Sequence, residues 1–314
     1  MGQALEGLTV LDLTQLLPGP VAGMLLGDFG ADVIKVEPPG GDPARAHGAT
    51  PDAPGPVFRA VNRNKRGLAL DLSRPEGRDV LLRLVDRADV LLEGFRPGVL
   101  PRLGLGWEVL ASRNPHLIYC AITGYGQDGP CAGVAGHDLN YMARSGVLGL
   151  NAAKAGPPVI PGIQVADLSA GSLNAVIGVL LALQARERTG RGQMVDIAML
   201  DGVFALMLLP LLRQLQDQVE PLPGADTLSG RYACYRIYET GDGRHAVLGA
   251  LEPKFWANAC QVLGRPDLVG RQFAEGEEQE AMQAEVASIF RAKTAAEWAA
   301  AFADRDACFS VVQS

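Results

Sequence analysis

The sequence predicts an α/β fold in which a large domain, built on a mainly parallel, Rossmann-like sheet, is followed by a smaller α+β domain. From residue 8 onward, short apolar runs alternate with helical stretches, and this alternation is typical of parallel strands joined by helices. Beyond residue 230 the order changes, because two strand patterns precede a series of helices. The chain has 314 residues, 48% of them hydrophobic, which is enough for two compact units.

Clusters of proline and glycine separate the elements of the first domain. Short apolar runs predict strands at residues 8–13, 33–36, 68–72, 90–92, 117–122 and 193–197. Longer apolar patterns predict helices at residues 21–29, 76–87, 138–148, 167–186 and 201–215. These elements assign residues 1–215 to the large domain.

Residues 216–230 are predicted to be a linker, because prolines and glycines recur in this segment. The small domain then covers residues 231–314. Strands are predicted at 232–238 and 246–251 around the turn at 241–243, and helices at 254–262, 278–291 and 295–302. The last residues, 307–314, resemble one more strand.

Charge and cysteine content narrow the possible partners. The net charge is −7 and no basic run is longer than Lys65-Arg66, which argues against nucleic acid as a partner. The five cysteines are odd in number and form no C-x-x-C pair, so we expect neither a disulfide framework nor structural zinc. The four histidines are isolated from one another, and we expect no metal.

The same composition favours a reducing cytoplasm. The amino terminus lacks the basic and apolar regions of a secretory signal. The apolar runs at 175–183 and 203–212 are shorter than the roughly 20 residues that a bilayer requires, so we expect buried helices and no membrane association.

The nucleotide-binding fingerprints G-x-G-x-x-G and G-x-x-x-x-G-K-[ST] are absent. Small residues nevertheless follow the strand at 117–122, where Gly124, Tyr125, Gly126 and Gln127 would let a ligand approach the backbone at a strand's carboxyl end. A plain surface turn explains these residues equally well.

Arg96 and Arg102 surround the turn after the strand at 90–92. The planar guanidinium group binds two phosphate oxygens at once, so a phosphorylated ligand is one interpretation. Solvated loop charges are the simpler one.

Three further residues are candidates for proton transfer. His137 precedes a helix that starts at Asp138, and the positive end of the helix dipole favours its neutral imidazole, which can accept a proton. Asp167 lies where the N-cap of the next helix is expected, and Glu252 lies just before Pro253. Taken singly, a core histidine, a helix cap and an acid in a first helical turn are the simpler explanations.

In their order along the chain, these residues resemble the family III CoA-transferases, and within them most closely the racemases of α-methylacyl-CoA. The resemblance extends from the first strand into the second domain and includes GDFGADVIKVEPPGGDP at 27–43, TGYGQDGP at 123–130 and GHD at 136–138. The other matching stretches are residues 5–13, 96–99, 103–106, 166–167, 189–193, 199–202 and 252–253.

The resemblance implies an acyl-CoA thioester substrate, no other cofactor, and an interlocked homodimer with the site between the large domain of one subunit and the small domain of the other. It implies that His137 and Asp167 are the acid–base pair of a racemase and that Glu252 orients the histidine. It assigns Arg96 and Arg102 to the CoA phosphates and residues 124–127 to the pantetheine path. The backbone N–H of Asp138 is a candidate donor to the enolate oxygen.

Two other functions stay open. In the transferases of the family the aspartate that matches Asp167 is a nucleophile, which forms acyl-aspartyl and aspartyl-CoA intermediates. The third possibility is an acyl-CoA binder without activity. The segment 223–226 lacks the run of four glycines found in formyl-CoA transferases. The family also implies a return segment to the large domain, which we expect to be missing because the chain ends at Ser314.

Overall fold

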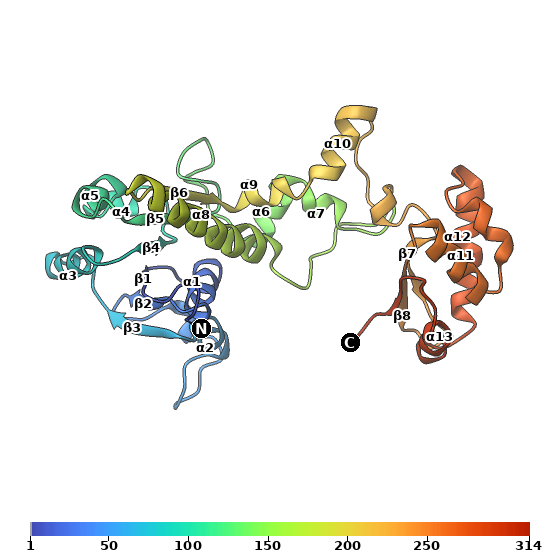
Figure 1. Ribbon diagram of the computed structural model, residues 1–314, viewed down its shortest axis with the longest axis horizontal. Helices are drawn as coiled ribbons and strands as arrows, with labels where there is room; N and C mark the ends of the chain where they lie inside the picture. Colours follow the sequence, from blue (N-terminus) through green and yellow to red (C-terminus); the bar gives the residue numbers. More distant parts are fainter. Residues whose placement is uncertain (1) are drawn as a thin grey trace. The chain divides into compact units, whose positions relative to one another are not determined.

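A computed structural model describes residues 2–314, and its elements form two compact units (Figure 1). The first unit runs up to Leu148 and includes Ile160–Leu209, whereas the second consists of Gly149–Val159 and Pro210–Ser314. The sequence pattern placed residues 149–159 and 210–215 in the large domain. The structure groups them with the second unit, where Lys154 pairs with Glu280 at 2.7 Å.

A six-stranded parallel sheet is the centre of the first unit, as the sequence predicts. Its strands are β1 (Thr9–Asp12), β2 (Asp32–Glu37), β3 (Lys65–Ala69), β4 (Val90–Glu93), β5 (Ile118–Thr123) and β6 (Met194–Ala198). Their spatial order is β3-β2-β1-β4-β5-β6, and all neighbouring pairs are parallel. From β1 the chain adds β2 and β3 on one side, and it then adds β4, β5 and β6 on the other, so the strand order reverses between β1 and β4. In open α/β sheets, ligands bind beyond the carboxyl ends of the strands at such a point.

Helices cover both faces of this sheet, because successive strand residues point to opposite sides. On one face, Val10 packs with α1 (Pro18–Asp28) and α8 (Asn174–Thr189). On the other face, Leu11 packs with α3 (Pro75–Val85) and α5 (Trp107–Arg113). The shorter helices of the unit are η1 (Pro43–Arg45), α2 (Pro56–Val61), α4 (Val99–Arg102), α6 (Asp138–Ser145), α7 (Val147–Leu150), η2 (Ala166–Leu173) and α9 (Met199–Ala205), of which α7 continues into the second unit.

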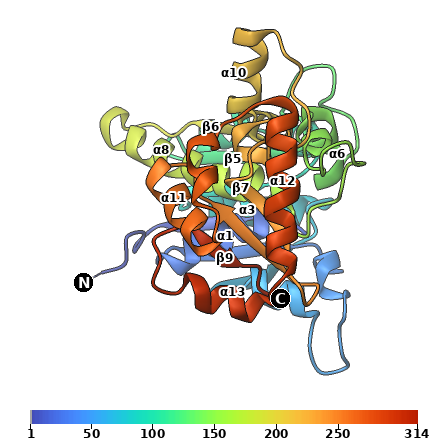
Figure 2. The same ribbon diagram turned by 90° about the vertical axis from the view of Figure 1, so that its right-hand side faces the viewer.

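The second unit is an α+β structure with its own core, and Figure 2 shows its elements from a second direction. Strands β7 (Tyr235–Glu239), β8 (His245–Gly249) and β9 (Phe309–Val311) form an antiparallel sheet. Helices α11 (Pro253–Val262), α12 (Gly276–Arg291) and α13 (Ala295–Phe302) contribute the buried Trp256, Phe290 and Trp298. Helix α10 (Leu208–Asp217) and the 3₁₀ turns η3 (Thr227–Ser229) and η4 (Pro266–Arg271) complete it.

Three helix predictions were wrong in detail. The helix predicted at 138–148 is broken into α6 and α7 by Gly146, whose φ of 87° ends α6 in the left-handed conformation. The helix predicted at 201–215 is two helices, α9 and α10, and Pro210 lies in the first turn of α10, where proline is tolerated. The helix predicted at 167–186 begins as the π-helix η2, so Asp167 is its second residue and Val165 is the N-cap.

The apolar length of this last helix also exceeds the sequence estimate. Residues Ala166–Thr189 form a continuous helical segment of 24 residues that is long and apolar enough to cross a membrane, and the bent pair of α9 and α10 passes the same test. Since core helices of globular proteins have the same property, this observation is weak evidence for a membrane span.

Candidate active site at the carboxyl ends of the strands

A cavity of about 550 Å³ opens at the carboxyl ends of the strands, at the point between β1 and β4 where the strand order reverses. Its walls are the loops that follow β1, β4 and β5, at residues 14–19, 94–97 and 122–125. The cavity is also lined by the segment 134–138, Gln164, Asp167 and Met199. Its volume is in the range of small-molecule sites.

His137 is the N-cap of α6 and faces this cavity with an exposed side chain, so the core-histidine interpretation is wrong. Its Nδ1 lies 2.8 Å from the backbone oxygen of Gly136. A carbonyl oxygen only accepts hydrogen bonds, so Nδ1 carries the proton and donates. In the neutral ring, Nε2 is then left with a free lone pair, as a general base requires.

Asp167 lies in the first turn of η2, half-buried on the wall of the same cavity. Its backbone N–H donates to the Asp138 carboxylate at 3.0 Å. Burial, helped by the negative charge of Asp138 and opposed by His137, raises the pKa of the Asp167 carboxyl to about 6. A carboxyl group with a pKa near the working pH can both give and take a proton. π-helical turns are frequent at functional sites.

Tyr141 fixes the segment that carries His137. Its hydroxyl donates to the backbone oxygen of Gly136 at 2.5 Å, the same carbonyl that His137 uses. Burial raises the pKa of this phenol to about 12, which keeps it a donor. Gly124 makes this possible, since a Cβ there would lie 2.6 Å from the tyrosine oxygen. No sequence motif signalled Tyr141.

Glu93 shapes the wall after β4, and it too was missed. The buried carboxylate accepts the N–H of Phe95 at 2.7 Å and the hydroxyl of Tyr119 at 3.1 Å. Burial raises its pKa to about 7. The bond to Phe95 orders the turn that leads to Arg96.

The remaining candidates lie in different places. Arg96 is exposed on the cavity wall, whereas Arg102 is exposed at the end of α4 and does not line the cavity. Gly124 and Tyr125 line the cavity; Gly126 lines a smaller neighbouring one of about 240 Å³. Gln127 donates its backbone N–H to Asp196 at 2.9 Å.

Glu252 belongs to the second unit, where it is the exposed N-cap of α11. Over residues 2–314, no group of three or more His, Cys, Asp or Glu side chains is arranged to hold a metal ion. Of the sequence candidates, the structure therefore brings six to one cavity: Arg96, Gly124, Tyr125, His137, Asp138 and Asp167.

The chain is similar to known proteins over almost its whole length. A family model described as CoA-transferase family III matches residues 5–314. Alpha-methylacyl-CoA racemase of Homo sapiens is 39% identical over 312 residues, which are 98% of this chain and 78% of that protein. Succinyl-CoA:mesaconate CoA-transferase of Haloarcula hispanica is 40% identical over 274 residues, 84% of this chain and 68% of that protein.

The fold is also found among solved structures. A CAIB/BAIF family protein from Brucella suis superimposes with a TM-score of 0.85 at 30% identity, over 100% of this chain and 85% of that one. Names of racemases and of transferases thus occur at similar identity, so similarity alone does not determine the reaction.

Proposed function

Because the chain belongs to CoA-transferase family III, we propose that it processes acyl-CoA thioesters and that its reaction is the racemisation of 2-methylacyl-CoA by 1,1-proton transfer. The observation that supports this most is that His137 and Asp167 line one cavity, the first with a free Nε2 and the second with a pKa raised to about 6. A racemase needs two such groups, one for each face of the α-carbon.

In the proposed mechanism, one member of the pair removes the α-proton, and the electron pair of the C–H bond moves into the thioester to form an enolate. The other member then returns a proton to the opposite face, so the net composition is unchanged. The enolate oxygen needs a donor. We assign it to the backbone N–H of Asp138, the first residue of α6, which has no partner among the hydrogen bonds of residues 2–314.

The CoA part is proposed to lie along the loops after β4 and β5. Arg96 and Arg102 are both exposed, so their guanidinium groups are available to phosphates. Gly124, Tyr125, Gly126 and Gln127 are proposed to line the pantetheine path, and Glu252 to orient the His137 imidazole. CoA enters as part of the substrate, and the proposal includes no metal and no other cofactor.

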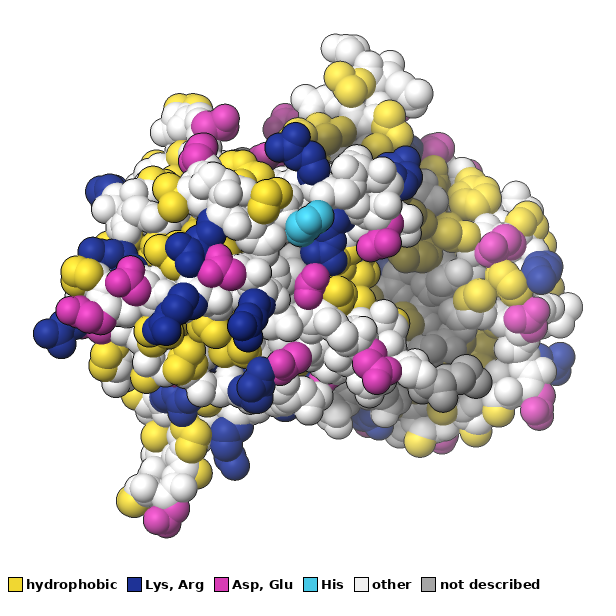
Figure 3. Space-filling view, turned by 60° about the vertical axis from the view of Figure 1, so that its left-hand side comes forward, with side chains coloured by type: hydrophobic (Ala, Val, Ile, Leu, Met, Phe, Trp, Pro, Cys, Tyr) yellow, Lys and Arg dark blue, Asp and Glu magenta, His cyan; other side chains and the backbone are white. Residues whose placement is uncertain are grey.

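A second copy of the chain is the proposed partner, in an interlocked homodimer. Helix α8 has exposed apolar side chains, with Ile177 at 53% and Leu181 at 65% exposure. Such surfaces mark interaction sites. Basic and acidic side chains are interspersed on the face in Figure 3 rather than gathered in a basic patch, which supports a proposal without nucleic acid. We also propose a cytoplasmic protein that does not bind membranes.

CoA transfer is the second candidate, and it is favoured by the 40% identity to a CoA-transferase. In that reaction the Asp167 carboxylate attacks the thioester carbonyl and the CoA thiolate leaves, giving an acyl-aspartyl anhydride. The thiolate then attacks the Asp167 carbonyl and releases the acyl group as a carboxylate. The aspartyl-CoA that remains transfers CoA to an acceptor acid.

Two variants separate these functions. His137→Ala removes one racemisation base and is expected to lower the rate of epimer interconversion at least about 100-fold, whereas the nucleophile of the transferase stays in place. Asp167→Asn is expected to abolish both reactions. Retention of full interconversion by His137→Ala contradicts the proposed roles; loss of transfer activity only in Asp167→Asn favours the transferase.

A further inference from the structure

The loop after β1 contains a residue in a strained conformation on the wall of the candidate active site. Leu16 has a φ of 66°, in the left-handed region that side chains with a Cβ disfavour. Its apolar side chain is 44% exposed and lines the cavity. Such strain persists only where the surroundings fix it, and it concentrates at functional sites.

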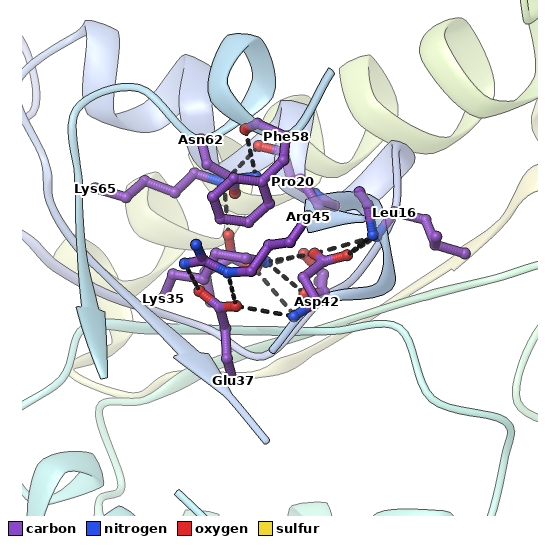
Figure 4. Close-up of polar contacts among 12 residues, drawn as sticks. Leu16, Pro20, Lys35, Glu37, Asp42, Arg45, Phe58, Asn62 and Lys65 are labelled. Carbon is purple, nitrogen blue, oxygen red and sulfur yellow. Dashed lines mark hydrogen bonds and ion pairs between the residues drawn. The ribbon is translucent and has the colours of Figure 1, made fainter. Parts of the chain in front are cut away.

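A buried carboxylate holds Leu16 in place. The backbone N–H of Leu16 donates to both oxygens of Asp42 at 3.3 Å, and Asp42 also accepts the N–H of Ala44 at 2.9 Å (Figure 4). The charge of Asp42 is paired with Lys35, whose Nζ lies 3.1 Å away. Both side chains are almost fully buried, at 0% and 2% exposure. A buried pair of this kind keeps its geometry, since separating the charges leaves one of them unpaired.

The same network holds the start of the loop. Lys35 donates to the backbone oxygen of Thr14 at 2.7 Å, and the backbone N–H of Thr14 donates to Asp12 at 3.0 Å. Asp12 is paired with Lys65 at 2.7 Å. Two buried ion pairs therefore hold the loop, and in Figure 4 the Leu16 side chain points away from these charges.

The end of the loop contacts the helix that contains Asp167. The hydroxyl of Ser172 donates to the backbone oxygen of Pro18 at 2.7 Å and to that of Asp167 at 3.1 Å. Leu16 is thus two residues from a direct link to η2. Leu16 lines the same cavity as Asp167, and its loop is tied directly to the helix that carries this aspartate.

We propose that Leu16 is a specificity-determining residue for the apolar chain of the acyl group, and that the buried Lys35–Asp42 pair is the positioning device that presents it. The proposal rests on the proposed function, because it names the part of the substrate that this wall selects. An apolar side chain held rigidly in an exposed position binds a hydrocarbon chain without the cost of ordering the loop.

The test compares 2-methyldecanoyl-CoA with 2-methylbutanoyl-CoA, by kcat/KM for α-proton exchange and by calorimetric binding. Leu16→Ala is expected to lower the preference for the longer chain about 10-fold, because it removes about three carbon atoms that the bound hydrocarbon chain would cover. Leu16→Gly should have the same effect without a lower Tm, because glycine adopts the left-handed conformation freely. Asp42→Asn should lower the preference in the same direction, yet change nothing further in the Leu16→Ala background.

Asp32→Asn is the matched control, because it breaks the exposed Asp32–Arg66 pair at the other end of β2 and should leave the preference unchanged. An unaltered preference in Leu16→Ala and Leu16→Gly overturns the proposal while the proposed function stands. A third outcome separates the two proposals. If the wild-type protein binds the longer thioester more tightly, Leu16→Ala loses this preference, and no α-proton is exchanged, the proposal for Leu16 is supported and racemisation is contradicted. A wild-type protein that binds neither ester contradicts both.

Discussion

The carboxyl group of Asp167 has a pKa of about 6 in the folded chain, against an ordinary value of 3.8, mainly because it is buried. Between these two pH values the folded state holds a proton that the unfolded state has released. The free energy of unfolding therefore falls as the pH rises from about 4 to 6, and the full loss is present above pH 6.

Asp167→Asn removes this ionisation and should stabilise the chain at pH 7.5 by about 2 kcal/mol, with almost no effect at pH 4. Urea unfolding at the two pH values measures it, and the exposed Asp304→Asn variant serves as a control that should change neither value. Equal destabilisation at both pH values would instead mean that Asp167 serves the fold as an ordinary helix-start residue.

At this scale the sequence predicted His137, Asp138, Asp167 and Arg96, and the structure brings these residues to one cavity. The GHD motif indicated His137 and Asp138, whereas Asp167 and Arg96 were predicted from a helix start and from a turn after a strand. Tyr141 and Asp42 were not predicted. Tyr141 acts through the Gly136 carbonyl that it shares with His137, and Asp42 acts through contacts with residues distant in the sequence. No local spacing of residue types encodes either arrangement.

At the scale of elements, the loop after β5 and helix α6 depend on each other through Gly124. A Cβ on Gly124 would overlap the ring of Tyr141, which supports the carbonyl that His137 uses. Gly124→Ala is therefore expected to lower kcat about 10-fold and the free energy of unfolding by about 1–3 kcal/mol. Steady-state rates and urea unfolding measure the two effects.

Gly133→Ala is the matched control, because its Cβ would meet no atom within 4 Å. Both properties should be close to those of the wild type. If Gly124→Ala behaves like the control, Tyr141 does not support the histidine in the way described here.

Element types were predicted well where an apolar run was bounded by turn residues, as in β4, β5 and α13. The errors concern breaks inside apolar runs. Hydrophobic periodicity does not mark Gly146 as a left-handed helix end, nor does it distinguish the π-helical turn of η2 from an α-helix. These positions are set by tertiary packing.

At the scale of the whole molecule, the exposed apolar face of α8 is expected to be covered by a second copy of the chain. Leu181→Glu would place a charge in that apolar contact and should weaken the dimer at least about 100-fold. Sedimentation equilibrium measures the dissociation constant. Val109→Glu, on the exposed side of α5, should leave it unchanged.

A wild-type chain that sediments as a monomer would contradict the dimer.

The α/β class and the order of the two units followed from the alternation of patterns, which is a property of the whole sequence. The grouping of residues 149–159 with the second unit could not be predicted from this alternation. It depends on contacts such as that of Lys154 with Glu280, which are 126 residues apart in the sequence.

Incubation of the wild-type protein with one epimer of a 2-methylacyl-CoA in D2O, without any acceptor acid, tests the proposed racemisation most directly. We expect deuterium to enter at the α-carbon together with formation of the other epimer, because the proposed mechanism has His137 and Asp167 exchange protons on opposite faces. No deuterium incorporation, combined with CoA transfer once an acceptor acid is added, would contradict the racemase and support the transferase.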